Sequence, residues 1–577
     1  MWRQTELRRR WSLAAAVLPV CVMAASVVCA ADPAGEELFR AQLAAGEFAP
    51  ALAAARQAPT PAQRDAWLAE VAQAQAHSGM RDAALNSAAD IGNDLSRAQS
   101  VAQLAREPLG GLGGGGEADF ESLIDLITST VRPASWDGVG GPGSIAGFPT
   151  GVSVDAQGLV RKMLREESGD ALAKLRAAGT EHATRGDVRR DSPLRMVSLP
   201  RLEKQVQLRQ ARGQLPTEAM QVLAGLQRIE YLFVYPESGD LVVAGPAGDW
   251  TPTAENRIVS VQGGWPVMRL DDLVVVMRHV FSGPDARFGC MITPTQEGLA
   301  RVQAFVKESG KSAIQAEQRP AWLTRLRREL GTQDIEVYGL DPHTHAARIM
   351  VEADYRMKLV GIGLEAGVPG VQSYLASVTV PAGQAPPPMG VLRWWFTLNY
   401  DALAASNDHL AFALRGQGVK VQSENERLTA EGKRIHTGQA EDLNRKFAQS
   451  FTQHFTALAA KYPVYAELQN LFDLAVIGTL LREEDLPARL GWHMTCFGDP
   501  AAFQVELGAA PKKVESVVNC RVVNRIHILA GVSGGVAVNP SPLVERSAMQ
   551  LDRQGGLAVQ RASVLQTLPH DAWWWDP

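Results

Sequence analysis

The chain has 577 residues, with 57 basic and 62 acidic side chains and a formal net charge of −5. Hydrophobic residues make up 46% of it and charged residues 21%, which are the proportions of a globular protein. At roughly 100–200 residues per domain, this length predicts three to five domains. The acidic balance argues against nucleic acid as a partner, because nucleic-acid binders need a basic face. The mean hydropathy of −0.09 argues against a polytopic membrane protein.

Residues 1–30 are typical of an export signal. Four arginines within the first ten residues precede an apolar run at 11–28, and the small residues 28–31 suit cleavage after Ala30 or Ala31. We therefore expect an exported protein, either periplasmic or extracellular. The alternative is an uncleaved anchor helix, since 18 apolar residues are just long enough to span a bilayer. No other transmembrane segment is expected.

Residues 32–107 are rich in alanine and predict a helical module. The stretches that begin at Gly46 and Gly79 match at an offset of 33 residues, which fits a repeat of tetratricopeptide type. Such a module either forms a protein-binding groove or packs as an adaptor. The glycines of residues 108–117 lack the Lys-Ser/Thr of a phosphate loop and predict a flexible linker.

Residues 118–180 predict a small α/β segment. Its sequence at 123–127 (LIDLI), Trp136 and 140–145 (GGPGSI) resembles the ring-building N-terminal segments of secretins. No secretin pore sequence follows, so the resemblance implies no channel. Residues 165–215 are charged and predict an exposed helix and a linker.

Residues 195–380 predict an α/β domain. Strands are expected at 229–235 and 241–244, and helices at 271–281, from a Thr293 cap through Val306, and at 323–330 before Gly331. Residues 348–359 alternate between apolar and mostly charged side chains, which predicts a strand with one buried face. A further strand is expected at 374–380, before a proline-rich stretch at 381–388.

Residues 390–577 predict an α+β domain. Aromatic-rich strands are expected at 391–400, 411–414 and 419–422. Two long helices, one after Thr437 and one from Pro463, predict an antiparallel hairpin. Residues 510–577 are strand-like and end in three tryptophans. The expected fold class is therefore multidomain α+β.

The region 195–540 also carries a family resemblance. The motifs are residues 199–203 (LPRLE), 234–236 (VYP) with 245–246 (GP), 352–358 (EADYRMK), 393–396 (RWWF), 423–426 (SENE) and 468–474 (LQNLFDL). They resemble a family of secreted planctomycete proteins of unknown function. Since that family has no known activity, the resemblance implies no catalytic residue.

Cys290, Cys496 and Cys520 follow the signal region, and their odd number and wide spacing fit neither a disulfide framework nor a zinc motif. Either Cys496 and Cys520 pair, or all three are buried free thiols.

Ser533 lies in a G-x-S-x-G pattern at 531–535, with His570 and Asp571 downstream. A serine nucleophile elbow needs a helix directly after the turn. Here a strand-like stretch follows, so we expect a glycine-rich hairpin turn in preference to a hydrolase site.

Three further sets of residues can be interpreted either as functional sites or as ordinary structural positions. His343 and His345, with Glu352 or Asp354, suit a zinc site or a solvated turn. Glu424 and Glu426 suit a glycosidase pair only with a sugar cleft. Trp394, Trp395 and the terminal tryptophans suit sugar stacking, although core packing and tail docking are commoner uses.

The leading hypothesis is a non-enzymatic binding or scaffold protein of the cell envelope, with a protein partner there. It assigns no catalytic residue, metal ligand or cofactor. The alternative is a secreted hydrolase, either metal-dependent at His343 and His345 or serine-based at Ser533. The sequence leaves the oligomeric state open.

Overall fold

The computed structural model describes residues 33–106, 144–148, 151–155, 187–309, 318–379 and 390–577, apart from 45, 79, 254, 256, 430, 432, 509, 524–525 and 570–571. Several expectations lie outside these residues. They are the signal at 1–30, the linker at 108–117, most of the secretin-like segment, the proline-rich stretch at 381–388, and His570 with Asp571.

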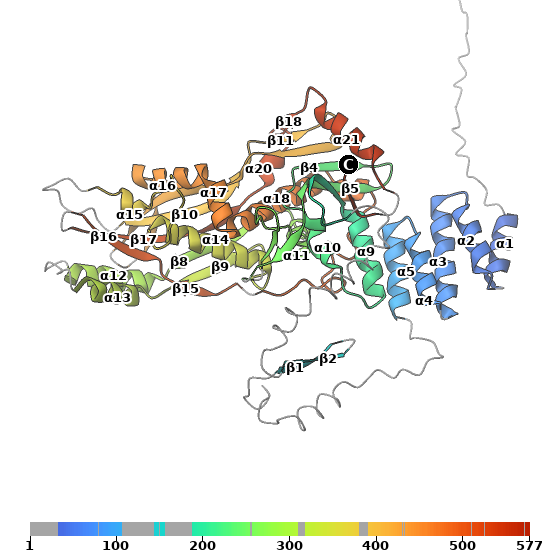
Figure 1. Ribbon diagram of the computed structural model, residues 1–577, viewed down its shortest axis with the longest axis horizontal. Helices are drawn as coiled ribbons and strands as arrows, with labels where there is room; N and C mark the ends of the chain where they lie inside the picture. Colours follow the sequence, from blue (N-terminus) through green and yellow to red (C-terminus); the bar gives the residue numbers. More distant parts are fainter. Residues whose placement is uncertain are drawn as a thin grey trace, which may run out of the picture.

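The alanine-rich N-terminal region is helical, as predicted, and forms the blue group at one end of the molecule (Figure 1). Its helices are α1 (Pro33–Ala44), α2 (Phe48–Arg56), α3 (Pro61–His77), α4 (Arg81–Ala89) and α5 (Asp94–Arg106). Their apolar core is completed by Leu208 and Ala211 of α9 (Leu199–Ala211), so the module packs directly on the rest of the chain. Helices α2 and α4 begin 33 residues apart, but a tetratricopeptide repeat stays a prediction.

The larger sheet has eight strands within the described residues. Their order is β14 (Arg434–His436), β13 (Gly418–Leu428), β10 (Gly390–Asn399), β17 (Ile526–Val538), β8 (Phe288–Pro294), β9 (Thr332–Tyr338) and β15 (Lys513–Glu515), and β16 (Val518–Val523) also pairs with β17. β10 and β17 are parallel, and the other neighbours are antiparallel.

The second sheet has seven strands within the described residues. Their order is β18 (Gln550–Leu551), β11 (Ala402–Ala405), β12 (Ala411–Arg415), β4 (Tyr231–Tyr235), β5 (Asp240–Ala247), β3 (Ser192–Ser198) and β19 (Trp574–Trp575). Two hairpins stand apart from both sheets, β1 (Ser144–Phe148) with β2 (Gly151–Asp155) and β6 (Trp250–Pro252) with β7 (Ile258–Ser260). Both large sheets mix strands from before and after residue 385, so the boundary expected there does not separate two cores.

Most of the remaining helices lie around these sheets, and α18 (Val464–Glu483) is buried among them (Figure 1). They are α10 (Glu218–Gln221), η3 (Leu223–Gly225), α11 (Leu270–Phe281), α12 (Gln296–Ser309), α13 (Arg319–Leu330), α14 (His345–Gly361), α15 (Tyr374–Ser377), α16 (Asp442–Gln453), α17 (Phe455–Lys461), α18 (Val464–Glu483), α19 (Leu486–Arg489), α20 (Ser541–Val544) and α21 (Gly556–Gln566). The molecule is therefore a mixed α+β protein, as predicted at that coarse level.

Helix α18 is the central core helix. It packs on α11 and α14, and nearly every one of its side chains is buried. It is also the one described helix that is long and apolar enough to cross a membrane by length and composition. Its most apolar window is entirely buried inside the protein, which is how the core helix of a globular domain behaves.

Several predicted elements are confirmed. Helix α11 covers the expected 271–281, and α13 ends at Gly331, whose φ of 71° is the left-handed conformation expected of a stop. Strands β4, β5, β10, β12 and β13 lie where the pattern places them.

Four predictions are wrong, and one predicted helix begins later than expected. Residues 348–359 form α14, and 374–377 form α15, where strands were expected. Helix α12 begins after Thr295, whose hydroxyl accepts the Gly298 N–H, because β8 extends through Thr293 and Pro294. Residues 165–215, expected to be an exposed helix and a linker, contain the strand β3 and the helix α9, and α9 is largely buried. The expected hairpin of long helices also does not form, since α16 packs on β13 while α18 packs on α11 and α14.

Candidate functional site

The densest group of polar side chains that the sequence singled out lies on β13. Glu424 and Glu426 are two residues apart in this strand, so they project from the same face. Their exposed fractions are 4% and 6%. The sheet register places Arg393 of β10 opposite Glu424, and His436 of β14 opposite Glu426. An arginine and a histidine from the two neighbouring strands therefore flank two buried carboxylates.

Glu424 is held by three donors. Arg393 Nη1 lies 3.1 Å from its Oε2, His436 Nδ1 lies 3.3 Å from the same oxygen, and the Gly438 N–H donates to Oε1 at 2.7 Å. Burial by itself raises the pKa of this carboxyl, but these donors together outweigh it, so the pKa of Glu424 is lowered. The carboxyl is thus held in its ionised form.

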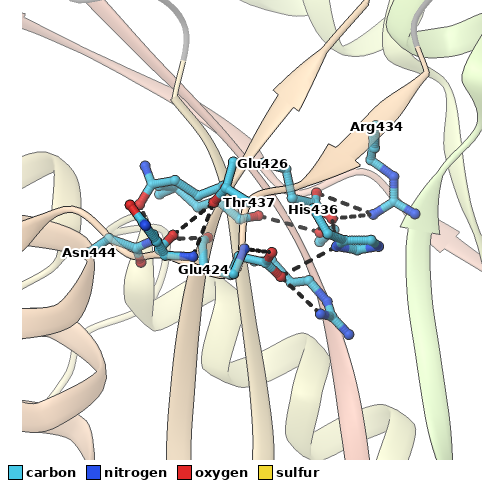
Figure 2. Close-up of polar contacts among 12 residues, drawn as sticks. Glu424, Glu426, Arg434, His436, Thr437 and Asn444 are labelled. Atoms are coloured by element: carbon cyan, nitrogen blue, oxygen red, sulfur yellow. Dashed lines mark hydrogen bonds and ion pairs between the residues drawn. The ribbon is translucent and has the colours of Figure 1, made fainter.

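Glu426 binds Arg434, His436 and Ser533. Arg434 Nη1 lies 3.2 Å and 3.3 Å from its two oxygens, and His436 Nδ1 lies 3.2 Å from Oε1. The hydroxyl of Ser533 donates to Oε2 at 3.0 Å. Figure 2 shows the two glutamates directed toward His436, with Arg434 at the outer end of the group.

Side-chain contacts to the backbone fix the hairpin that carries this group. Asn444 of α16 donates to the Glu424 carbonyl and to Asn425 Oδ1, both at 2.9 Å (Figure 2). It also accepts a hydrogen bond from the Trp394 indole at 2.5 Å. The Thr437 hydroxyl donates to the Asn425 carbonyl at 2.5 Å. The cluster therefore has a rigid support that extends into the core.

Beside this cluster is an open hollow of about 320 Å³. Lys433, Arg434 and His436 line one side of it, and the start of α12 with Asp334 lines the other. Inside the cluster the carboxylates and cations largely neutralise one another, which is what buried charges require. Facing the hollow, the basic side chains outnumber the acidic one.

Ser533 is not placed as a nucleophile. It is 2% exposed and sits in the middle of β17, between β10 and β8, with the ladder continuing through Gly534 and Gly535. Its hydroxyl contacts are Glu426 and the Leu392 carbonyl, and neither is an imidazole. A serine hydrolase needs a base that takes this proton and an exposed turn, and this strand offers neither. The expected glycine-rich hairpin turn is also wrong, because 531–535 is continuous strand.

His343 and His345 have separate partners. His343 precedes α14, is exposed, and contacts Asp341 at 2.9 Å, whereas His345 is buried and contacts Asp272 at 2.9 Å. Glu352 pairs with Arg257, and Asp354 pairs with Lys358 in the core. Among the described residues, no three His, Cys, Asp or Glu side chains are grouped to hold a metal ion. The structure does not assemble the zinc set that the sequence suggested.

The tryptophans and cysteines take structural positions. Trp394 is fully buried, Trp395 lies under the Arg393 guanidinium, and the C-terminal tryptophans dock beside β3.

The three cysteines are free thiols. Cys290 and Cys496 are buried, and Cys520 is half-buried. Burial raises the pKa of the Cys496 thiol to about 12, so it is protonated near neutral pH.

Comparison with known proteins identifies one part of the chain. The family model described as "Protein of unknown function (DUF1598)" matches residues 290–374. This segment is a DUF1598 domain. A search of curated proteins and a search of solved structures gave no match.

The DUF1598 domain spans most of β8 through α14 and ends at the first residue of α15. It contains His343, His345 and the Asp354–Lys358 pair, but neither Glu424 nor Ser533. Of the resemblance noted over 195–540, the match supports a domain of unknown function at 290–374, whereas the planctomycete origin and the secretion stay predictions. The family description carries no activity, so it assigns no role to the Glu424–Glu426 cluster.

Sequence reasoning found the acidic half of the cluster and missed its basic half. Glu424 and Glu426 were singled out as a pair and Ser533 by itself, and the sheet brings the three together. Arg393, Arg434 and His436 were missed because they lie on β10 and β14, the two strands on either side of β13. Only the register of β10, β13 and β14 makes them neighbours, and a single sequence does not contain that register.

Proposed function

We propose that this protein is an exported, non-enzymatic binding protein of the cell envelope, and that β14 receives an extended, acidic segment of a partner protein. The single observation that carries the proposal is the hollow beside the β13–β14 hairpin, with Lys433, Arg434 and His436 on its wall. Behind this wall, Glu424 and Glu426 are held by hydrogen bonds and paired with arginines. The cluster therefore suits a structural role, in which it holds the binding surface in place.

The backbone of β14 favours this mode of binding. β14 is the first strand in the order of the larger sheet and, among the described residues, pairs with β13 alone. An edge strand can accept a further strand from a partner through main-chain hydrogen bonds. Ile435 in the centre of β14 is 48% exposed, so it offers an apolar contact between two basic neighbours.

The charge of the wall selects the partner. Lys433 is exposed beside Arg434 and His436, whereas the opposite wall contributes Asp334 as its acidic group. An acidic strand with alternating apolar residues matches both the charges and Ile435. The expected export signal at 1–30 and the expected repeat at 32–107 belong to the same proposal, since both suit an envelope protein with a protein partner.

Binding is tested with a fluorescent peptide of alternating glutamate and valine, measured by anisotropy against the purified chain. We expect Lys433→Glu to weaken binding about tenfold and added salt to weaken it further, because the attraction is electrostatic. Lys446→Glu, an exposed change on α16, is the matched control and leaves the affinity unchanged. Equal binding of a lysine–valine peptide, or no effect of Lys433→Glu, contradicts the proposal.

Export is tested separately by fractionating cells that produce the full chain and the chain without residues 1–30. We expect the full chain to appear outside the cytosol with a mass shortened by the signal, and the truncated chain to remain in the cytosol. Intact precursor in the cytosolic fraction contradicts this part of the proposal.

A further inference from the structure

A second cavity, of about 230 Å³, lies where α17 and α18 meet the segments that precede β4 and α11. Gln227 and Arg228 come from the segment before β4, Trp265 from the segment before α11, and Gln469 and Asn470 from α18. The cavity is remote in sequence from the β13–β14 hairpin and shares no lining residue with the hollow beside it.

Two amides on α18 give the cavity unused acceptors. Gln469 and Asn470 are 8% and 6% exposed, and their nitrogens donate to the carbonyls of Gln417 at 2.5 Å and Pro266 at 3.4 Å. Within the described residues, the two amide oxygens receive no hydrogen bond. Both residues line the cavity, so their amide oxygens are open to it and a ligand that carries donors can bond to them in place of water.

The charge of the cavity is already balanced. Arg228 is the one lining residue with a formal charge, and Asp473 holds its guanidinium through contacts of 3.0 Å and 3.2 Å. Asp473 also accepts the Tyr400 hydroxyl at 2.6 Å. A charged ligand would find no counter-charge here, whereas a neutral ligand avoids the cost of burying an unpaired charge.

The other walls are apolar. Trp265 is half-buried, and Phe455, Pro246 and Ala466 complete a surface on which a flat apolar face can lie. The volume is below the roughly 300–1,000 Å³ of sites for drug-sized ligands, so it suits a single ring. Thr456, which is exposed, stands at the rim.

We propose that this cavity binds one ring of a neutral sugar. The ring's apolar face lies on Trp265, and its hydroxyls donate to the amide oxygens of Gln469 and Asn470. The side-chain amide of Gln227, which lines the cavity, donates to a ring or hydroxyl oxygen. This inference goes beyond the proposed protein-binding function and does not depend on it.

The test is saturation-transfer NMR on the purified full chain with glucose, galactose and N-acetylglucosamine as probes. Glycerol, glutamate and inorganic phosphate are the non-sugar comparators. We expect at least one sugar to bind with a millimolar dissociation constant, and the comparators to give no transfer. No transfer to any of the three sugars, or equal transfer to the comparators, overturns the proposal.

Two variants locate the binding. Thr456→Trp closes the rim without touching the core and is expected to weaken sugar binding at least tenfold. Ala457→Trp adds the same bulk at the next exposed position of α17, which does not line the cavity, and is expected to leave binding unchanged. Asn470→Leu removes one acceptor and is expected to weaken binding about fivefold. Equal losses in Thr456→Trp and Ala457→Trp, or no loss in Thr456→Trp, overturn the assignment to this cavity.

Discussion

Two buried charges on α14 face each other inside the main core. Asp354 and Lys358 are one helical turn apart, both are 0% exposed, and Lys358 Nζ lies 2.6 Å from Asp354 Oδ2. Lys358 also donates to the Ile292 carbonyl at 3.3 Å. Burial raises the pKa of Asp354 and lowers that of Lys358, because each charged form has lost its water. The charged form of each side chain is therefore stabilised by its partner more strongly than in an exposed ion pair.

Removing one member of this pair is expected to be more damaging than removing both. We expect Lys358→Met to lower the free energy of unfolding by about 3–5 kcal/mol, because it leaves Asp354 buried without a partner. The double variant Asp354→Leu/Lys358→Met is expected to recover most of that loss. Denaturant titration measures both, with Lys446→Met as the exposed control. A double variant no more stable than Lys358→Met would contradict the pairing argument.

The ionised state of Glu424 gives the β13–β14 hairpin a predictable response to acid. Since the folded pKa lies below the ordinary value of 4.5, the stabilisation by Arg393 and Gly438 is complete above that value. It is lost as the pH falls through the lowered folded pKa. Glu424→Gln abolishes this contribution, so the variant is expected to lose less stability than the wild type as the pH falls below 4.5.

Hydrogen exchange of the β14 amides as a function of pH measures this response, and Glu441→Gln on the exposed helix start is the control. Parallel pH profiles for the wild type and Glu424→Gln would show that Glu424 does not hold the hairpin.

At the scale of elements, α14 shows why a regular pattern misled. Ile349, Val351, Ala353 and Met357 fit an alternation of period two, and they are also buried in the helix. The helix buries a broad face that includes Met350, Asp354 and Lys358, and the strand pattern counted those three as outward. Thr344, whose hydroxyl accepts the Ala347 N–H, was the helix-start signal. Charged residues were assumed to be solvated, and only the packed core shows them paired.

Elements with end signals were predicted better than elements defined by alternation alone. Helix α13 has Gly331 after it, and β4 and β5 are joined by a turn that contains Pro236 and Gly239. The pairing of β10 with β17, which are separated by more than a hundred residues, has no local signal. For the same reason the candidate site was predicted only as separate residues.

The end of α14 depends on a glycine that lets it approach β10. A Cβ on Gly361 would lie 2.1 Å from Trp394 Cζ3 and 2.9 Å from Phe447 Cζ. Trp394 is fully buried and bound to Asn444, so it has little room to move. Gly361→Ala is therefore expected to destabilise the protein by about 1–3 kcal/mol through overpacking.

Gly283→Ala is the matched control for this change, since nothing lies within 4 Å of its added Cβ. Thermal and denaturant unfolding of the two variants measure the difference. If the two alanine variants are equally stable, the close approach of α14 to Trp394 is not a constraint.

At the scale of the whole molecule, strands from distant parts of the chain close both sheets. We call the described residues from 187 onward, which contain both large sheets, the main body. β17 lies between β10 and β8 in the larger sheet, and β19 pairs with β3, the first strand of the main body. Polar contacts attach the N-terminal helices α1–α5 to the rest of the chain. His493 Nδ1 lies 2.6 Å from Asp94 Oδ1, and the Arg81 side chain donates to the Ala211 carbonyl. Both large sheets therefore include strands from the C-terminal part of the described chain.

The C-terminal tail supplies the carboxylate for a buried arginine. Arg195 on β3 is 0% exposed, and its Nε and Nη2 lie 2.9 Å from the two oxygens of Asp576. Asp576→Asn is expected to cost about 1–3 kcal/mol of stability, because it removes the charge that compensates Arg195. Deleting residues 573–577 is expected to cost more, since two buried tryptophans, each worth about 1.5–3 kcal/mol, leave with it. Denaturant midpoints measure both changes against removal of the exposed Pro577 alone, and a tail deletion as stable as that control would mean that the main body closes without β19.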